Sequence, residues 1–165
     1  MVEKVYTLVV LLQTNIITAE EYNASLDELF LENLDNKLLL ELQCFSKNIN
    51  DTRSIITEYI YQNNYVLDYN VFGRALFKNL SELYKSNVRH VHRFRLRRNR
   101  MSIEKFARKM HRVWNFLPGE IQSVEPFWAL SYAYNLLYCG EKQTRQLYER
   151  AFSYDWNTEI ARPIE

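Results

Sequence analysis

The clearest helical pattern in the chain is Ser102-Ile103-Glu104-Lys105-Phe106-Ala107-Arg108-Lys109-Met110-His111-Arg112-Val113-Trp114-Asn115-Phe116-Leu117. Its apolar residues recur at steps of three and four, and they are Ile103, Phe106, Met110, Val113, Trp114 and Leu117. The charged residues lie between them and therefore share the opposite face of a helix. Ser102 is a typical N-cap residue, and Pro118 follows the last apolar position. The pattern predicts a helix with one buried stripe and one charged face.

Similar patterns occur along most of the chain, which has only three Gly and three Pro among its 165 residues. So few chain breakers favour helices joined by short polar turns. Val2 to Gln13 is apolar nearly all round, and the residues expected to cap later helices are Thr18, Asp35, Asp51 and Asp68. A last helix follows Gly140. We therefore expect an all-α fold: a single-domain helical bundle, or a short helical-hairpin array, of about seven helices over residues 1–156, with a flexible tail at 157–165.

Two segments are harder to assign. Residues 88–100 fit a continued helix, or a strand with Arg93, Arg95 and Arg97 on one face and Phe94 and Leu96 on the other; the helix is slightly favoured. The region after Pro126 is too apolar for an exposed loop, so we expect it to lie against the core, and its apolar residues are Trp128, Leu130, Tyr132, Leu136, Leu137 and Tyr138.

Charge is distributed unevenly, although the net charge is only +1. Residues 1–84 carry 6 basic and 12 acidic side chains, residues 85–112 carry 11 and 1, and residues 113–165 carry 4 and 7. The densest basic run offers Arg93, Arg95, Arg97, Arg98 and Arg100 as candidate partner-binding residues. An acidic helix face offers Glu20, Glu21, Asp27 and Glu28. These two sets either pair within the molecule or bind partners of opposite charge.

The sequence holds no recognised catalytic or cofactor motif, so we expect a protein that is not an enzyme and binds no cofactor. His90, His92 and His111 lack nearby ligands, which argues against a metal site. Two cysteines form no disulfide framework, and the N-terminal apolar run is too short for a secretory signal or a membrane span. We expect a cytoplasmic protein with no membrane or small-molecule partner.

The C-terminal third resembles small helical immunity proteins that accompany bacterial polymorphic toxins and contact-dependent growth-inhibition systems. The resemblance rests on Trp114-Asn115-Phe116-Leu117-Pro118, Glu125-Pro126-Phe127-Trp128, Ser131-Tyr132-Ala133, Gly140-Glu141-Lys142-Gln143-Thr144-Arg145 and Tyr148-Glu149. It implies a non-catalytic protein that binds a toxin domain and blocks its active site or its access to substrate. It identifies no particular contact residue.

Two functional hypotheses follow. The first is an immunity protein that neutralises a cognate toxin, which fits the separated charges and the twelve Tyr, a residue enriched at interfaces. The second is a small nucleic-acid-binding regulator that uses the Arg-rich segment 89–100, because guanidinium groups bind phosphates and adjacent rings stack on bases. The nearly neutral chain favours a protein partner over a nucleic acid.

Overall fold

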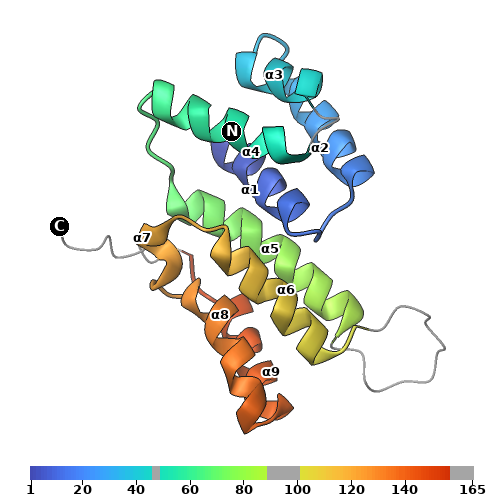
Figure 1. Ribbon diagram of the computed structural model, residues 1–165, viewed down its shortest axis with the longest axis vertical. Coiled ribbons are helices and arrows are strands. Elements are labelled where there is room, and N and C mark those ends of the chain that lie inside the picture. Colours follow the sequence, from blue (N-terminus) through green and yellow to red (C-terminus); the bar gives the residue numbers. More distant parts are fainter. Residues whose placement is uncertain (46–48, 89–100, 157–165) are drawn as a thin grey trace. The chain divides into compact units, whose positions relative to one another are not determined.

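The structure is a computed structural model of the chain and describes residues 1–45, 49–88 and 101–156. Within these ranges every regular element is a helix, which confirms the all-α prediction for this part of the chain (Figure 1). The described residues divide into two compact units, unit 1 up to Phe72 and unit 2 from Gly73 onward. The single domain proposed over residues 1–156 stays a prediction. The helix-or-strand question at 89–100 and the tail at 157–165 lie outside the described residues.

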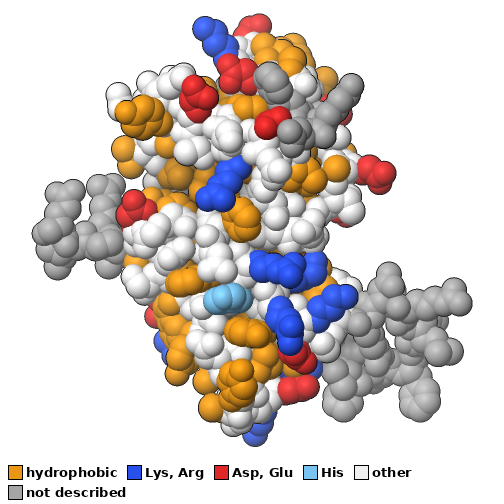
Figure 2. Space-filling model, in the orientation of Figure 1, with side chains coloured by type: hydrophobic (Ala, Val, Ile, Leu, Met, Phe, Trp, Pro, Cys, Tyr) orange, Lys and Arg blue, Asp and Glu red, His pale blue; other side chains and the backbone are white. Residues whose placement is uncertain are grey.

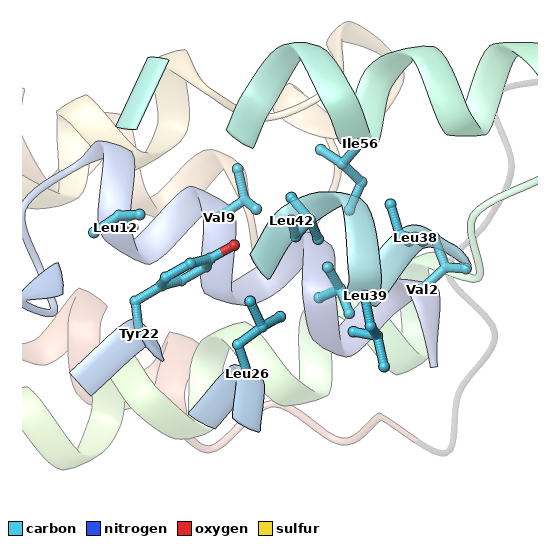
Figure 3. Close-up of a cluster of buried hydrophobic side chains, with 10 residues drawn as sticks. Val2, Val9, Leu12, Tyr22, Leu26, Leu38, Leu39, Leu42 and Ile56 are labelled. Carbon is cyan, nitrogen blue, oxygen red and sulfur yellow. The ribbon is translucent and has the colours of Figure 1, made fainter. Parts of the chain in front are cut away.

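Unit 1 contains α1 (Val2–Gln13), α2 (Ala19–Glu32), α3 (Lys37–Phe45), α4 (Ile49–Gln62) and the first turn of α5 (Tyr69–Asn87). Both α1 and α3 pack against α2 and α4. The helices share one buried cluster (Figure 3), which consists of Val2, Val5, Val9, Leu12, Tyr22, Leu26, Leu38, Leu39, Leu42 and Ile56. Each large apolar side chain buried in this way contributes about 1.5–3 kcal/mol of transfer free energy.

Polar side chains set several helix starts of unit 1, but two of the predicted caps are wrong: Asp51 lies inside α4, which already begins at Ile49, and Asp35 does not cap α3. Thr18 forms the expected capping box, in which its hydroxyl accepts from the Glu21 amide while the Glu21 carboxylate accepts from the Thr18 amide. Asp68 also caps as predicted, because its carboxylate accepts from the Asn70 and Val71 amides. The predicted cap at Asp35 is wrong. Asn36, one residue later, accepts from the Leu39 amide instead.

A buried carboxylate joins α1 to the loop that precedes α5. Glu3 is only 4% exposed, and its Oε1 accepts from the Tyr65 hydroxyl at 2.7 Å and from the Asp68 amide at 3.3 Å. Burial alone would raise the pKa of Glu3, but these hydrogen bonds outweigh it and hold the pKa below its ordinary value of 4.5. The same bond raises the pKa of Tyr65 to about 12. Glu3 is therefore ionised in the folded protein at neutral pH.

Unit 2 contains the rest of α5, then α6 (Ile103–Asn115), α7 (Gly119–Gln122), α8 (Trp128–Asn135), a short 3-10 helix η1 (Leu136–Cys139) and α9 (Glu141–Phe152). Helix α6 packs against α8 and α9, which also pack against each other. Its core is aromatic: the Phe106 ring lies 5.3 Å from the Tyr84 ring and 5.1 Å, edge-on, from the Tyr148 ring. Aromatic pairs of this geometry add about 0.5–1.5 kcal/mol beyond their buried area.

A glycine makes room for the last described aromatic residue. Trp156 packs its ring against Phe77 and Phe127, with ring centroids 5.5 and 5.9 Å away. A Cβ at Gly73 would overlap the Trp156 ring and would also approach Phe127 to 2.8 Å. The Arg74 guanidinium donates to the Trp156 carbonyl at 3.2 Å. Gly73 is therefore present because α5 must let this ring come close.

The region between Pro118 and Gly140 differs most from the predictions. It forms α7, α8 and η1, so the described residues contain more helices than the approximate seven expected. Of the apolar residues expected against the core, Leu130 is buried and Trp128, Leu136 and Leu137 are partly buried, but Tyr132 is 49% exposed and Tyr138 is 93% exposed. The expectation that both tyrosines lie against the core is wrong, because α8 is a short helix that buries only one side and η1 has no fully buried residue.

We predict that Glu3→Gln lowers the free energy of unfolding at neutral pH by about 1–3 kcal/mol, because the Tyr65 hydroxyl and the Asp68 amide lose a charged acceptor. The pKa of Glu3 is lower in the folded state than in the unfolded state. Its stabilising effect is therefore complete above about pH 4.5 and is lost as the pH falls through the lowered folded value. Urea unfolding followed by circular dichroism from pH 7 to pH 3 should show a weaker acid destabilisation in the variant. Parallel stability curves for both proteins would contradict this role.

We predict that Gly73→Ala destabilises unit 2 by about 1–3 kcal/mol through overpacking, even though Ala is intrinsically the better helix former by about 1 kcal/mol. All three Trp lie in unit 2, so fluorescence-detected unfolding reports on this unit. Gly119→Ala is the matched control, because nothing lies within 4 Å of a Cβ there. In a Trp156→Ala background the Gly73→Ala penalty should become smaller, because only the close approach to Phe127 remains. A penalty of unchanged size would show that the Trp156 ring is not its cause.

Candidate interaction surface

Helix α6 sorts its side chains onto two faces, as its sequence predicted. Its inner face buries Ile103, Phe106, Ala107, Met110 and Val113 completely, or nearly so. The Ser102 hydroxyl accepts from the Lys105 amide at 3.1 Å and caps the helix. With the inner stripe fixed against α8 and α9, the outer positions have fixed directions as well. The outer face carries Lys105, Arg108, Lys109 and Arg112.

The four cations of this face are crowded and have few acidic neighbours. Arg108 forms an exposed ion pair with Glu104, one turn earlier, at 2.6 Å. Burial lowers the pKa of Lys109, and repulsion from Lys105 and Arg112 lowers it further. Lys105 and Arg112 form no ion pair with any other residue in the described ranges. Lys105 and Arg112 therefore leave the surface with a net positive charge.

Aromatic rings from α6 and α8 continue this surface. The His111 ring lies between the rings of Trp114 and Tyr134, nearly parallel to both, with centroids 5.9 and 5.5 Å away. His111 Nδ1 is 3.1 Å from the Ser131 hydroxyl, which fixes the imidazole against α8. All three rings are half-buried, so each keeps part of its surface in contact with solvent.

Two further contacts define the edges of the surface. Trp114 Nε1 donates to the Gln122 carbonyl at 2.8 Å, while Gln122 Nε2 donates back to the Trp114 carbonyl at 3.2 Å, so α7 holds this indole in place. At the other edge, the pKa of Arg108 is raised chiefly by Glu104, with smaller contributions from the nearby Tyr134 and Tyr138 hydroxyls. Tyr138 projects almost fully into solvent.

We call this region the basic–aromatic surface and define it as Lys105, Arg108, Lys109, Arg112, His111, Trp114, Tyr134 and Tyr138. Figure 2 shows Lys and Arg side chains gathered over α6, beside hydrophobic side chains over α8. Exposed cations next to partly exposed rings on a rigid helical support can bind an anionic, partly apolar surface.

The candidate residues predicted from the sequence are not those of the basic–aromatic surface. Arg93, Arg95, Arg97, Arg98 and Arg100 are outside the described residues. Glu20, Glu21, Asp27 and Glu28 are all exposed on α2 of unit 1, but two of them have structural roles. Glu21 belongs to the capping box, and Asp27 accepts from Gln43 Nε2 at 3.0 Å. Only Glu20 and Glu28 are left exposed without such a role.

The basic–aromatic surface was not among the sites predicted from the sequence, although the sequence pattern indicates part of it. The outward face of α6 follows from the periodicity of residues 102–117. The prediction instead named the arginines of residues 93–100, which precede this helix in the sequence and are more closely spaced. Tyr134 and Tyr138 could not have been added, because only the packing of α6 on α8 brings them beside the cations.

In the part of the chain that the structure describes, no group of three or more His, Cys, Asp or Glu is arranged to hold a metal ion. No helix in that part of the chain has both the length and the apolar character needed to cross a membrane. Comparison of the chain with protein-family models, curated proteins and solved structures finds no match.

Proposed function

We propose that this chain is a non-catalytic, cytoplasmic binding protein that neutralises a cognate toxin domain, as the resemblance to immunity proteins implies. The observation that supports this proposal is the basic–aromatic surface. Inhibitory protein interfaces depend on a few well-anchored aromatic and arginine side chains, surrounded by contacts that exclude water. Trp114, Tyr134 and Arg108 are residues of these types on one support.

Preorganisation supports a binding function for this surface. The outer residues of α6 are fixed by its buried stripe, and His111 is held by a ring on each side and by the Ser131 hydroxyl. A partner would therefore not have to order the His111 ring on binding, whereas the exposed Lys105 and Arg112 side chains would still lose conformational freedom. Because each mobile side chain that becomes ordered costs about 0.5–1.5 kcal/mol, a surface of this kind binds more tightly for the same area.

The charge of the surface specifies the chemistry of the partner. Lys105 and Arg112, which form no ion pair within the described residues, favour carboxylates on the opposing face, so the toxin domain should present an acidic patch around its active site or substrate entrance. Bound there, the chain would cover the patch and exclude substrate. Exposed charges at such an interface mainly increase the association rate, while the rings limit dissociation.

We predict that Lys105→Glu/Arg112→Glu abolishes protection in cells that co-express the toxin encoded immediately upstream, and that the two proteins no longer co-purify. The reversal replaces attraction by repulsion at two exposed positions that support no fold contact. Lys78→Glu/Lys85→Glu is the matched control, since both are exposed lysines of α5 outside the basic–aromatic surface. The control should protect like the wild type. Absence of any complex between the wild type and the upstream protein would refute the proposal.

A second candidate function is nucleic-acid binding, through this surface together with the Arg-rich segment 89–100. Stacked rings beside exposed cations are the elements that single-stranded nucleic acids bind. This alternative predicts retention of a labelled RNA or DNA oligonucleotide at low salt, with log K falling by roughly 0.7–0.9 per neutralised phosphate as log salt rises. Gel-shift titrations of the wild type and the Lys105→Glu/Arg112→Glu variant would measure it. No shift of the wild type at low ionic strength would exclude it.

A further inference from the structure

Three exposed leucines lie at one end of the α2–α3 hairpin in unit 1. Leu31 of α2 is 73% exposed, Leu34 of the connecting turn is 61% exposed and Leu40 of α3 is 43% exposed. The Asp27–Gln43 hydrogen bond sets the register of the two helices. One turn beyond Asp27 on α2 is Leu31, and about one turn before Gln43 on α3 is Leu40. Antiparallel helices therefore place both leucines at the same level, next to Leu34 in the turn.

Acidic side chains surround these leucines. The α2 face that ends at Leu31 carries Glu20, Asp27 and Glu28, all exposed. Glu32, Asp35 and Glu41 are exposed too, close in sequence to the three leucines. Figure 2 shows hydrophobic and acidic side chains side by side over this end of unit 1. We define the acidic–leucine surface as Leu31, Leu34, Leu40, Glu20, Asp27 and Glu28. The rim is mostly acidic, although the exposed Lys37 lies three residues from both Leu34 and Leu40. An apolar patch with a charged rim is typical of an interaction site.

The two units carry opposite charge. Residues 1–72 contain 4 basic and 11 acidic side chains, a net charge of −7, whereas residues 73–165 contain 17 and 9, a net charge of +8. The whole chain is therefore nearly neutral, but the negatively charged unit 1 of one molecule attracts the positively charged unit 2 of another. At low salt such charges act over roughly 30 Å, and at physiological salt over roughly 8 Å.

We propose that the acidic–leucine surface of one molecule binds the basic–aromatic surface of a second copy of this chain. The two surfaces match in charge, and each combines charge with apolar groups. They also match in length: Glu20 to Glu28 spans about 12 Å of helix and Lys105 to Arg112 about 10 Å. Because each molecule carries both surfaces, any solution of this protein contains the two complementary surfaces at equal concentrations. This contact does not depend on the proposed toxin-binding function.

The contact is asymmetric, because one molecule contributes its acidic–leucine surface and the other contributes its basic–aromatic surface. The association is therefore head-to-tail and can continue from one copy to the next. It also occupies the basic–aromatic surface of every copy except one at the end. Binding of an acidic partner to that surface and self-association therefore exclude each other, and an acidic partner converts assemblies to single copies.

The test uses two complementary variants of the full chain in sedimentation velocity. Glu20→Lys/Glu28→Lys removes the acidic surface, because the charge of its three acidic positions changes from −3 to +1, and Lys105→Glu/Arg112→Glu removes the basic surface, because the charge of its four basic positions changes from +4 to 0. Neither variant should associate alone, even at about 10 mM salt, because each lacks one of the two complementary surfaces. Mixed in equal amounts, they should form mainly a one-to-one dimer, since the unaltered acidic surface of one pairs with the unaltered basic surface of the other, while the two altered surfaces carry little charge. A contact between units within one molecule cannot produce this dimer.

The wild type should show a concentration-dependent rise from 19.9 kDa to at least twice that mass at about 10 mM salt, and a return to 19.9 kDa at about 1 M salt. Leu31→Ser/Leu34→Ser, which leaves every charge in place, should weaken association at least several-fold. Glu58→Lys, elsewhere in unit 1, and Lys78→Glu/Lys85→Glu should leave it intact.

Failure of the mixed variants to pair, or a wild type that stays monomeric at low salt, would overturn this inference. The proposed function is tested separately. Glu20→Lys/Glu28→Lys keeps the basic–aromatic surface, so it should still protect cells against the toxin although it no longer self-associates.

Discussion

The structure of unit 2 depends on the apolar stripe of α6. Phe106 lies between Tyr84 and Tyr148 in an aromatic core, and Met110 and Val113 continue this contact along the helix without exposure to solvent. The stripe fixes the rotation of α6 about its own axis. A helix with 3.6 residues per turn cannot bury these positions without turning Lys105, Lys109 and Arg112 outward. Burial of the apolar stripe therefore builds the core and also determines the direction in which the charged residues of α6 point.

The other surface residues depend on polar contacts between helices. Ser131 and Tyr134 of α8 hold the imidazole of His111, and Gln122 of α7 holds the Trp114 indole by its nitrogen. A ring that is fixed in this way loses little conformational entropy when a partner covers it. Unit 1 contains polar contacts of a similar kind in its interior. There the buried Glu3 carboxylate accepts from Tyr65 and from the Asp68 amide, and so ties the loop before α5 to the first helix.

Local signals in the sequence were enough to predict much of the fold but little of the surface. Thr18 and Glu21 interact with each other within one turn, so their capping box could be read directly from the sequence. Asp35 and Asn36 are adjacent and equally able to cap, and only the path of the turn selects Asn36. The stretch that forms α8 and η1 is apolar nearly all round, so its periodicity could not reveal that Tyr132 and Tyr138 face solvent. Tyr134 meets α6 only after folding, and no sequence pattern could place it there.

The separation of charge between the units gives the two surfaces a common physical origin. A sequence could have distributed its acids and bases evenly, and the net charge would have been the same +1. Instead the acids follow the exposed positions of α2, where those at its N-terminus also favour the helix dipole, while the bases follow α6. Like charges on one unit repel each other. On α6, burial lowers the pKa of Lys109 and repulsion from Lys105 and Arg112 lowers it further. An oppositely charged partner bound at either surface would relieve such repulsion and so lower an electrostatic cost already present in the folded protein.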